Sequence, residues 1–178
     1  IKNGNREQYR VYTPFKNHCL RVLNESHSKN YKIDLLSLNQ RQEVIFKNLP
    51  EHDLKSNSLN LSKSSLLKGG RSEGIKLLKN FYENGLKEYK SQRDYPAIKG
   101  TSLLSAHLHF GTVGIRECFR TAFVKLNKVN SENKQNEIQT WINELLWREF
   151  YYNITFHNPQ IAHESFKKEF NKLKWNND

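Results

Sequence analysis

The sequence predicts a mainly α-helical protein, and three observations support this fold class. Apolar residues recur at helical spacing in several segments after residue 72, most regularly over residues 113–126. Thr13 followed by Pro14 has the form of a helix cap and first turn. Turn signals at residues 93–96 and 157–159 separate the periodic segments instead of interrupting them.

The first part of the chain predicts a short strand over residues 9–12 and then the helix that Thr13 opens. Periodicity weakens over residues 25–71, where serine, asparagine and paired glycines predict a solvated connector. This connector is longer than a compact domain normally leaves without regular structure, which indicates a linker between domains.

The second part predicts a helix over residues 72–89, weakened at Gly85, and a short helix from about Ser102 to Gly111. The most regular helix follows over residues 113–126, and residues 128–136 predict a polar loop. A helix around Trp141 comes next. A last helical stretch is expected from about Ser165.

Length and composition restrict the class of protein. The 178 residues are enough for one domain or for parts of two. The chain starts at Ile1 and has no methionine, so we expect an internal segment of a longer protein; the alternative is a small protein without its initiator. No apolar run is long enough to span a membrane. Cys19 and Cys118 lack metal or disulfide spacing, which favours a reducing cytoplasm.

The formal net charge of +11 favours a polyanionic partner such as nucleic acid. Abundant lysine and asparagine also arise from an AT-rich genome, so charge alone is a weak indication. The residues themselves are more informative. Thr101, Ser102 and Ser105 place three hydroxyls at a predicted helix start, where free N–H groups favour a phosphate. Simple helix capping explains the same residues.

The helix around Trp141 has two different faces at 100° per residue. Ile142, Leu146 and Phe150 form an aliphatic stripe. The opposite face carries a mixed set, with Trp147 at its edge: Trp141, Glu144, Arg148 and Tyr151. Indoles beside a carboxylate and a guanidinium suit a flat, partly polar ligand. The simpler alternatives are core tryptophans and a Glu144–Arg148 ion pair of about 0.2–0.5 kcal/mol.

Other candidate sites give weaker signals. His107 and His109 project to different faces of a helix, so no metal site is expected. Arg93 beside Asp94 indicates either a local ion pair or a phosphate contact. The sequence shows no nucleophile–base pattern and no glycine-rich phosphate fingerprint, and we predict no catalytic residue in this chain.

Four segments, in order, resemble the DNA photolyase and cryptochrome family. The stretch from Tyr89 to Ser105 is similar to the entrance of that family's flavin site, and Trp141 to Tyr151 is similar to its other early signature. Leu108 to Gly111 and Val11 to Phe15 also match, the latter resembling the segment that leaves the antenna domain. The resemblance is strongest to class I cyclobutane pyrimidine dimer photolyases.

The resemblance implies a cofactor and its contacts. FAD, active when fully reduced, is expected, and a folate or deazaflavin antenna chromophore can accompany it in the complete protein. The positions matching the family's FAD contacts are Tyr89, Thr101, Ser102, Leu103, Leu104, Ser105, Trp141 and Arg148. Leu103 departs from the family pattern, which often has a basic residue there. The family's remaining flavin contacts and its electron-transfer groups match positions beyond residue 178.

The resemblance also implies a substrate. Glu144 and Trp147 match residues that face damaged bases, and Arg93 matches a DNA-phosphate contact; Tyr151 joins them as an expected DNA-binding residue. The implied function is light-driven repair of cyclobutane pyrimidine dimers by a monomeric cytoplasmic enzyme, with this segment inactive alone. One alternative is a cryptochrome-type photoreceptor without repair activity. Another is a helical nucleic-acid-binding module without flavin.

The domain organisation that follows from the resemblance has three parts. Residues 1–25 would end an N-terminal α/β antenna domain, and residues 26–71 would form the interdomain linker. Residues 72–178 would be the first part of the all-helical FAD-binding domain.

Overall fold

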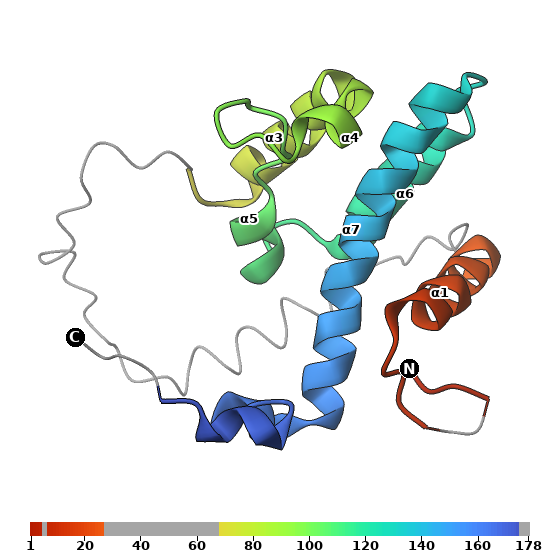
Figure 1. Cartoon of the computed structure of the whole chain (residues 1–178). Helices are drawn as coiled ribbons and strands as arrows, with labels where there is room; N and C mark the ends of the chain where they lie inside the picture. Colours follow the sequence, from red (N-terminus) through yellow and green to blue (C-terminus); the bar gives the residue numbers. More distant parts are fainter. Residues whose placement is uncertain (5–6, 27–67, 175–178) are drawn as a thin grey trace, which may run out of the picture.

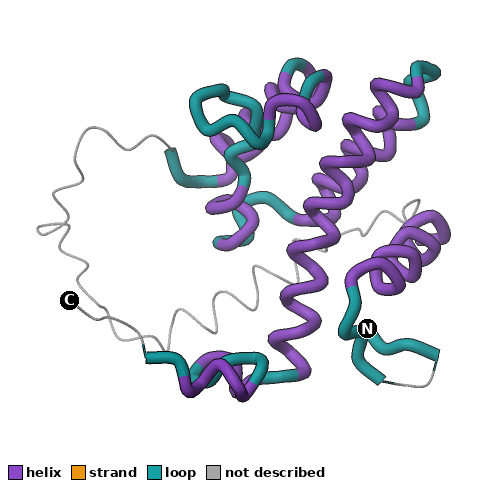
Figure 2. Tube along the Cα trace, viewed as in Figure 1, coloured by secondary structure: helices purple, strands orange, loops and turns teal. Residues whose placement is uncertain are grey.

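A computed structural model of the chain describes residues 1–4, 7–26 and 68–174, and within these ranges the protein is mainly helical, as predicted. Figure 2 shows helices and loops in this part of the chain. In the described residues, the one pairing of extended backbone is an isolated antiparallel bridge between Lys2 and Gln8. The helices are α1 (Tyr12–Ser26), α3 (Arg71–Glu83), α4 (Tyr89–Gln92), α5 (Ser105–His109), α6 (Ile115–Leu126) and α7 (Glu132–His157), with 3-10 turns η1 (Gly85–Lys87), η2 (Pro159–Ala162) and η3 (Lys168–Lys172).

Helix α7 is the central element of the fold. It contacts α6, α1 and α4, and Figure 1 shows α1 on one side of it and the α3–α5 group on the other. Because neighbours lie on more than one side, α7 buries both the predicted aliphatic stripe and part of the opposite face. The buried residues of α7 are Ile138, Trp141, Ile142, Leu145, Leu146 and Phe150.

Aromatic and aliphatic side chains from all of these helices meet in one core. Phe15 of α1, Cys118 of α6 and Ile142 of α7 each have 0% of their surface exposed. A buried phenylalanine contributes on the order of 1.5–3 kcal/mol relative to an exposed one, so this core is what fixes α1 and α6 against α7. No helix in the described ranges is long and apolar enough to cross a membrane.

Several predicted boundaries differ from the structure. The strand expected over residues 9–12 is absent from the described backbone, because α1 already begins at Tyr12. The helix expected over residues 72–89 ends at Glu83 and is followed by η1 and α4. Gly85 lies in this break. A Cβ atom there would lie 2.6 Å from the Phe81 ring, so the close packing of Phe81 requires glycine at this turn.

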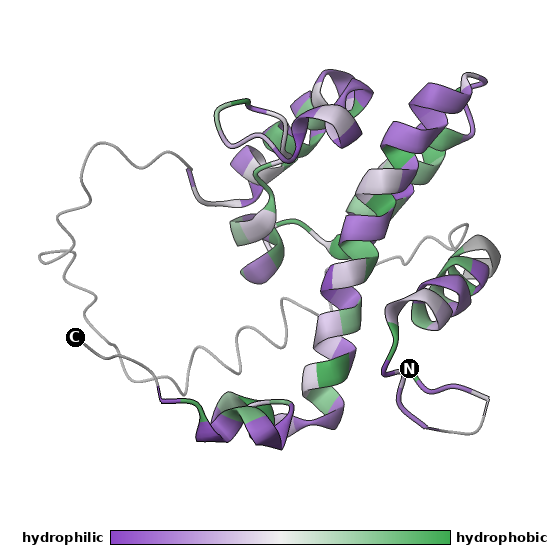
Figure 3. Cartoon of the chain, viewed as in Figure 1, coloured by the Kyte–Doolittle hydropathy of each residue, from purple (hydrophilic) through white to green (hydrophobic). Residues whose placement is uncertain are grey.

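The polar loop predicted over residues 128–136 is longer than the loop in the structure, because α7 begins at Glu132. Figure 3 shows hydrophilic residues in the first turns of α7, where the apolar period gives no signal. The final helical stretch expected from Ser165 is the short 3-10 turn η3. Most of the predicted linker lies outside the described residues.

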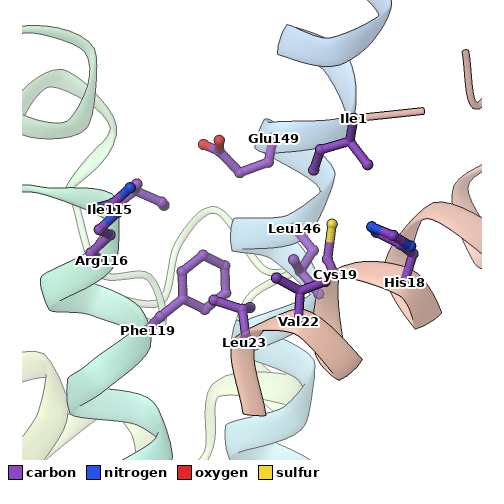
Figure 4. A pocket seen from close by; sticks show the side chains of 10 residues that line it. All are labelled: Ile1, His18, Cys19, Val22, Leu23, Ile115, Arg116, Phe119, Leu146 and Glu149. Atoms are coloured by element: carbon purple, nitrogen blue, oxygen red, sulfur yellow. The ribbon is translucent and has the colours of Figure 1, made fainter. Parts of the chain in front are cut away.

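A cavity of about 310 Å³ lies where α1, α6 and α7 meet (Figure 4). Cys19, Phe119 and Leu146 are among its apolar lining residues, and His18 and Glu149 are among its polar ones. Burial raises the pKa of the Cys19 thiol to about 11 and that of the Cys118 thiol to about 12. Both thiols therefore remain protonated near neutral pH and act as small core residues.

Candidate functional site

The hydroxyl-rich segment Thr101–Ser105 is a turn that leads into α5. The helix starts at Ser105, three residues later than the sequence predicts. Leu103 has a φ of 53°, the only non-glycine residue of the described chain with a positive φ, and this conformation does not continue into a helix. The Ser102 Oγ atom accepts a hydrogen bond from the Leu104 amide at 3.4 Å. A turn of this hand can direct successive N–H groups toward one side, as anion-binding turns do.

The segment is anchored at one residue and open at others. Leu104 is 1% exposed and packs in the core. Thr101, Leu103 and Ser105 are exposed, and Ser102 is half-buried. The hydroxyls are therefore accessible while the backbone that carries them is fixed by a buried leucine. This arrangement fits a phosphate-binding turn.

Tyr89 and the short helix α4 lie directly before this turn. Tyr89 is buried and meets Phe81 edge-to-face, with ring centroids 5.5 Å apart. Burial raises the pKa of its phenol. A Cβ atom on Gly100 would lie 2.6–2.8 Å from atoms of Gln92, so the chain that returns from α4 packs tightly against α4. The position of α4 consequently sets where the Thr101 turn begins.

Glu144 pairs with a different arginine from the one that helical spacing predicts. Its carboxylate accepts from Nη1 of Arg93, whose Nε also lies 3.2 Å from Oδ1 of Asp94. The alternative of a Glu144–Arg148 pair is not what the structure shows, because a local ion pair is too weak to decide side-chain placement against a partner from another segment. The hydrogen bond to Glu144 raises the pKa of the Arg93 guanidinium above its usual range. Arg93 also lies 5.7 Å over the Tyr89 ring.

Arg148 ties α7 to the end of α5 instead. Its Nη2 donates to the Leu108 carbonyl at 3.0 Å, and its Nη1 pairs with Glu149 at 2.5 Å. The guanidinium also lies 4.5 Å over the Tyr152 ring. Cationic side chains stabilise the free carbonyls at a helix C-terminus. Arg148 therefore has a structural partner in α5, next to the predicted phosphate turn.

Trp147 and Tyr151 form an aromatic surface with a residue that the sequence did not single out. The Trp147 indole stacks on the Tyr12 ring with centroids 3.6 Å apart and planes 7° from parallel. Tyr151 lies 5.7 Å from the indole at 26° and is 61% exposed. Trp147 itself is only partly buried, so this surface reaches solvent.

Trp141 lies in the core. It is 2% exposed, and its ring centroid is 5.0 Å from that of Phe81. Phe81 in turn contacts Tyr89, so Tyr89, Phe81 and Trp141 form a continuous row of rings. Trp141 and Tyr89 thus share a neighbour. A contact of either with a cofactor stays a prediction.

The structure brings some of the predicted residues together. Arg93 and Glu144 are in direct contact, and Tyr89 lies beneath Arg93. Two residues that the sequence does not single out also contact this region. Glu137 accepts from the Lys90 amide in α4, and Tyr12 stacks on Trp147. No local pattern marks either residue, because each partner is distant in the sequence. Among the described residues, no group of three or more His, Cys, Asp or Glu has a metal-binding arrangement.

Comparison with known proteins gives consistent matches. The family model described as the FAD binding domain of DNA photolyase matches residues 141–178. The deoxyribodipyrimidine photo-lyase of Escherichia coli is 31% identical over 98% of this chain and 36% of its own length. The enzyme of the same name from Buchnera aphidicola is 31% identical over 100% of this chain and 36% of its length.

A solved structure agrees with the sequence matches. The class III photolyase of Agrobacterium tumefaciens has a TM-score of 0.70 and 27% identity, covering 100% of this chain and 36% of that protein. The chain belongs to the DNA photolyase family, as the sequence motifs predict. It spans about a third of the length of the relatives that it matches over its whole length.

Proposed function

We propose that this chain supplies one wall of the FAD site and part of the lesion-facing surface of a light-driven DNA repair enzyme. The reaction is splitting of cyclobutane pyrimidine dimers. The observation that carries the proposal is the joint presence on α7 of Glu144 and Trp147, one turn apart, with Glu144 paired to Arg93 at the end of α4. The names of the relatives support the same reaction.

The chain's residues fit FAD at the Thr101 turn. The hydroxyls of Thr101, Ser102 and Ser105 and the amides of Leu103 and Leu104 would hold its phosphates. Tyr89, Trp141 and Arg148 would be the further FAD contacts that this chain contributes. When bound and reduced, FAD supplies the light-absorbing electron donor, while the protein supplies placement and electrostatics.

A damaged base of the dimer would meet Glu144 and Trp147. The carboxylate accepts hydrogen bonds from pyrimidine edges, and the indole stacks on the rings. Such a base must leave the duplex, which is easier at a lesion that is already poorly stacked. Arg93 and Tyr151 would contact the DNA around it, and the net charge of +11 favours its approach. Arg93 also holds Glu144 in place before DNA binds.

The finer parts of the proposal follow the family. We propose a class I enzyme that acts as a monomer in the cytoplasm, with a folate or deazaflavin antenna chromophore held by residues outside this chain. We also propose that the end of the antenna domain is formed by residues 1–25, the interdomain linker by residues 26–71, and the first part of the FAD-binding domain by residues 72–178. Because further flavin contacts match positions after residue 178, the chain alone should bind FAD weakly and should not repair DNA.

The test uses the complete gene product with reduced flavin and an oligonucleotide that carries one cyclobutane dimer. We expect light-dependent restoration of the undamaged sequence. Trp147→Ala should weaken binding of the damaged strand by roughly 5- to 150-fold, the range for one aromatic–base stack. Glu132→Gln, at an exposed carboxylate in the first turn of α7, is the matched surface control.

Absence of restoration, with flavin bound and reduced, would contradict the enzyme and favour a cryptochrome-type photoreceptor. A product that purifies without flavin would favour a nucleic-acid-binding module.

A further inference from the structure

We propose that Tyr12 is a positioning residue for Trp147, and that it determines which face of this indole is available to a damaged base. The inference rests on the proposed function, because it assumes that Trp147 stacks on the lesion. It adds the start of α1, which the sequence assigns to the end of another domain, to the lesion-binding surface.

The geometry of the two rings supports an imposed contact. Their centroids are 3.6 Å apart and their planes differ by 7°, which is nearly complete overlap. Free aromatic pairs prefer offset or edge-to-face arrangements over such overlap. Something other than ring–ring attraction must therefore hold Tyr12 over Trp147.

Two further contacts of Tyr12 supply this restraint. Its hydroxyl donates to the Asn143 carbonyl at 2.8 Å, one turn of α7 before Trp147. Phe150 meets both rings edge-on, with centroids 5.8 Å from Tyr12 and 5.7 Å from Trp147. The ring is thus fixed at its tip, its edge and its face.

The backbone that carries Tyr12 is also fixed. Phe15, one turn further along α1, is 0% exposed, and its ring centroid lies 5.4 Å from that of Phe150. The start of α1 cannot move away from α7 without exposing Phe15. Tyr12 is consequently a permanent cover on one face of the indole, and a base can stack only on the remaining face.

Tyr12 also lies near the second group proposed to meet the lesion. Burial, and then the charge of Glu144, raise the pKa of the Tyr12 phenol to about 12. The hydroxyl therefore stays protonated at neutral pH and keeps its bond to Asn143. Glu144 and Trp147 both lie close to this one tyrosine, so a change at Tyr12 should disturb how the two are presented together.

The experiment compares Tyr12→Leu and Tyr12→Phe with Tyr9→Leu. Tyr9 is a matched control because it is a partly buried tyrosine of the same segment that contacts Phe15 and His18. Near-UV circular dichroism of the 178-residue chain reports the setting of Trp147, with Trp147→Phe used to assign the signal. Affinity of the complete gene product is measured for dimer-containing and undamaged oligonucleotides.

We expect Tyr12→Leu to remove the Trp147 signal and to weaken binding of dimer-containing DNA by about 2- to 12-fold, which corresponds to the range for one aromatic pair. Binding of undamaged DNA should not change. Tyr12→Phe keeps the ring and should have a smaller effect, and Tyr9→Leu should leave the selectivity for damaged DNA unchanged.

Two results would overturn the inference in distinguishable ways. If Trp147→Ala weakens binding of damaged DNA and Tyr12→Leu does not, Tyr12 has no positioning role although the proposed function stands. If Trp147→Ala itself has no effect on that binding, the proposed role of Trp147 fails, and the inference fails with it.

Discussion

Helix α7 is held by α1 and by α4 through different chemistry. Against α1, aromatic rings meet: Tyr12 lies on Trp147, and Phe15 lies beside Phe150. Against α4, two carboxylates of α7 act. Glu137 accepts from the Lys90 amide and Glu144 accepts from Arg93. Glu137 and Glu144 are seven positions apart, which places them on nearly the same side of the helix.

The difference follows from the helices themselves. Helix α1 has 15 residues and buries Phe15 completely, so apolar burial is enough to dock it. Helix α4 has four residues, which is far below the length at which a helix is stable alone. Its N-cap residue, Glu88, makes no side-chain capping bond, so a carboxylate from α7 satisfies one of its free amides. Trp147 therefore depends on the aromatic packing between α1 and α7, whereas Arg93 and Glu144 depend on weaker polar contacts between α4 and α7.

The largest expected effect lies on the aromatic side. Phe15→Ala should destabilise the protein by about 3–5 kcal/mol, because it removes a fully buried ring and leaves a cavity. Urea unfolding followed by far-UV circular dichroism measures this change. Val11→Ala, at a side chain that is 61% exposed, is the control and should change stability by less than about 0.5 kcal/mol. Equal effects of the two substitutions would show that α1 does not dock through its ring contacts.

A smaller and more local effect is expected on the carboxylate side. Glu137→Ala should cost about 0.5–2 kcal/mol, as loss of a helix cap does, and should increase hydrogen exchange in α4 more than in α1. Glu137→Gln keeps an acceptor oxygen and should retain much of the protection. Exchange measured by mass spectrometry on peptides covering residues 86–99 tests this. Unchanged exchange in α4 after Glu137→Ala would mean that the carboxylate does not hold it.

Salt should separate the two contacts further. The Arg93 and Glu144 side chains are 27% and 36% exposed, so added salt weakens their attraction, whereas the stack of Tyr12 on Trp147 carries no net charge.

The sequence predicts helices where one apolar face repeats. The pattern predicts α6 over residues 113–126, and the helix runs from Ile115 to Leu126. The pattern also predicts α7 around Trp141, but the first turns of α7 are polar and carry no apolar period, so its start at Glu132 gives no signal in the sequence. The end of α3 depends on how Phe81 packs against Gly85, which is a tertiary contact.

The candidate site shows the same limit. Its residue types and spacing follow from family motifs, and the roles of Thr101 and Ser105, whose residues are exposed, stay a prediction. The partners were not, since Glu144 pairs with Arg93 and not with Arg148, and Trp147 stacks on Tyr12, far away in the sequence. Sequence spacing identifies only the neighbours of a residue along its own helix. Partners from distant parts of the chain are set by tertiary packing, which spacing does not reveal.

The smallest expected effect is at a third contact, the exposed ion pair between Arg71 at the start of α3 and Glu117 in the first turn of α6. Arg71 donates to both carboxylate oxygens of Glu117, at 2.9 and 2.6 Å, and the Gly114 amide donates to the same carboxylate at 2.9 Å. The bond from Arg71, and then that from Gly114, lower the pKa of Glu117 from 4.5 to about 2.

A lowered carboxyl pKa gives stabilisation that is complete above the unfolded-state value and disappears as the pH falls through the folded-state value. Glu117→Gln should therefore reduce the folded-to-unfolded ratio by roughly two- to fivefold at pH 7, a modest change because solvent screens the pair. The difference between wild type and variant should shrink as the pH falls from 4.5 to about 2. Urea titrations at several pH values measure it, with Glu132→Gln, at an exposed carboxylate in the first turn of α7, as the control. A difference that stays constant with pH would show that the charge of Glu117 contributes nothing to stability.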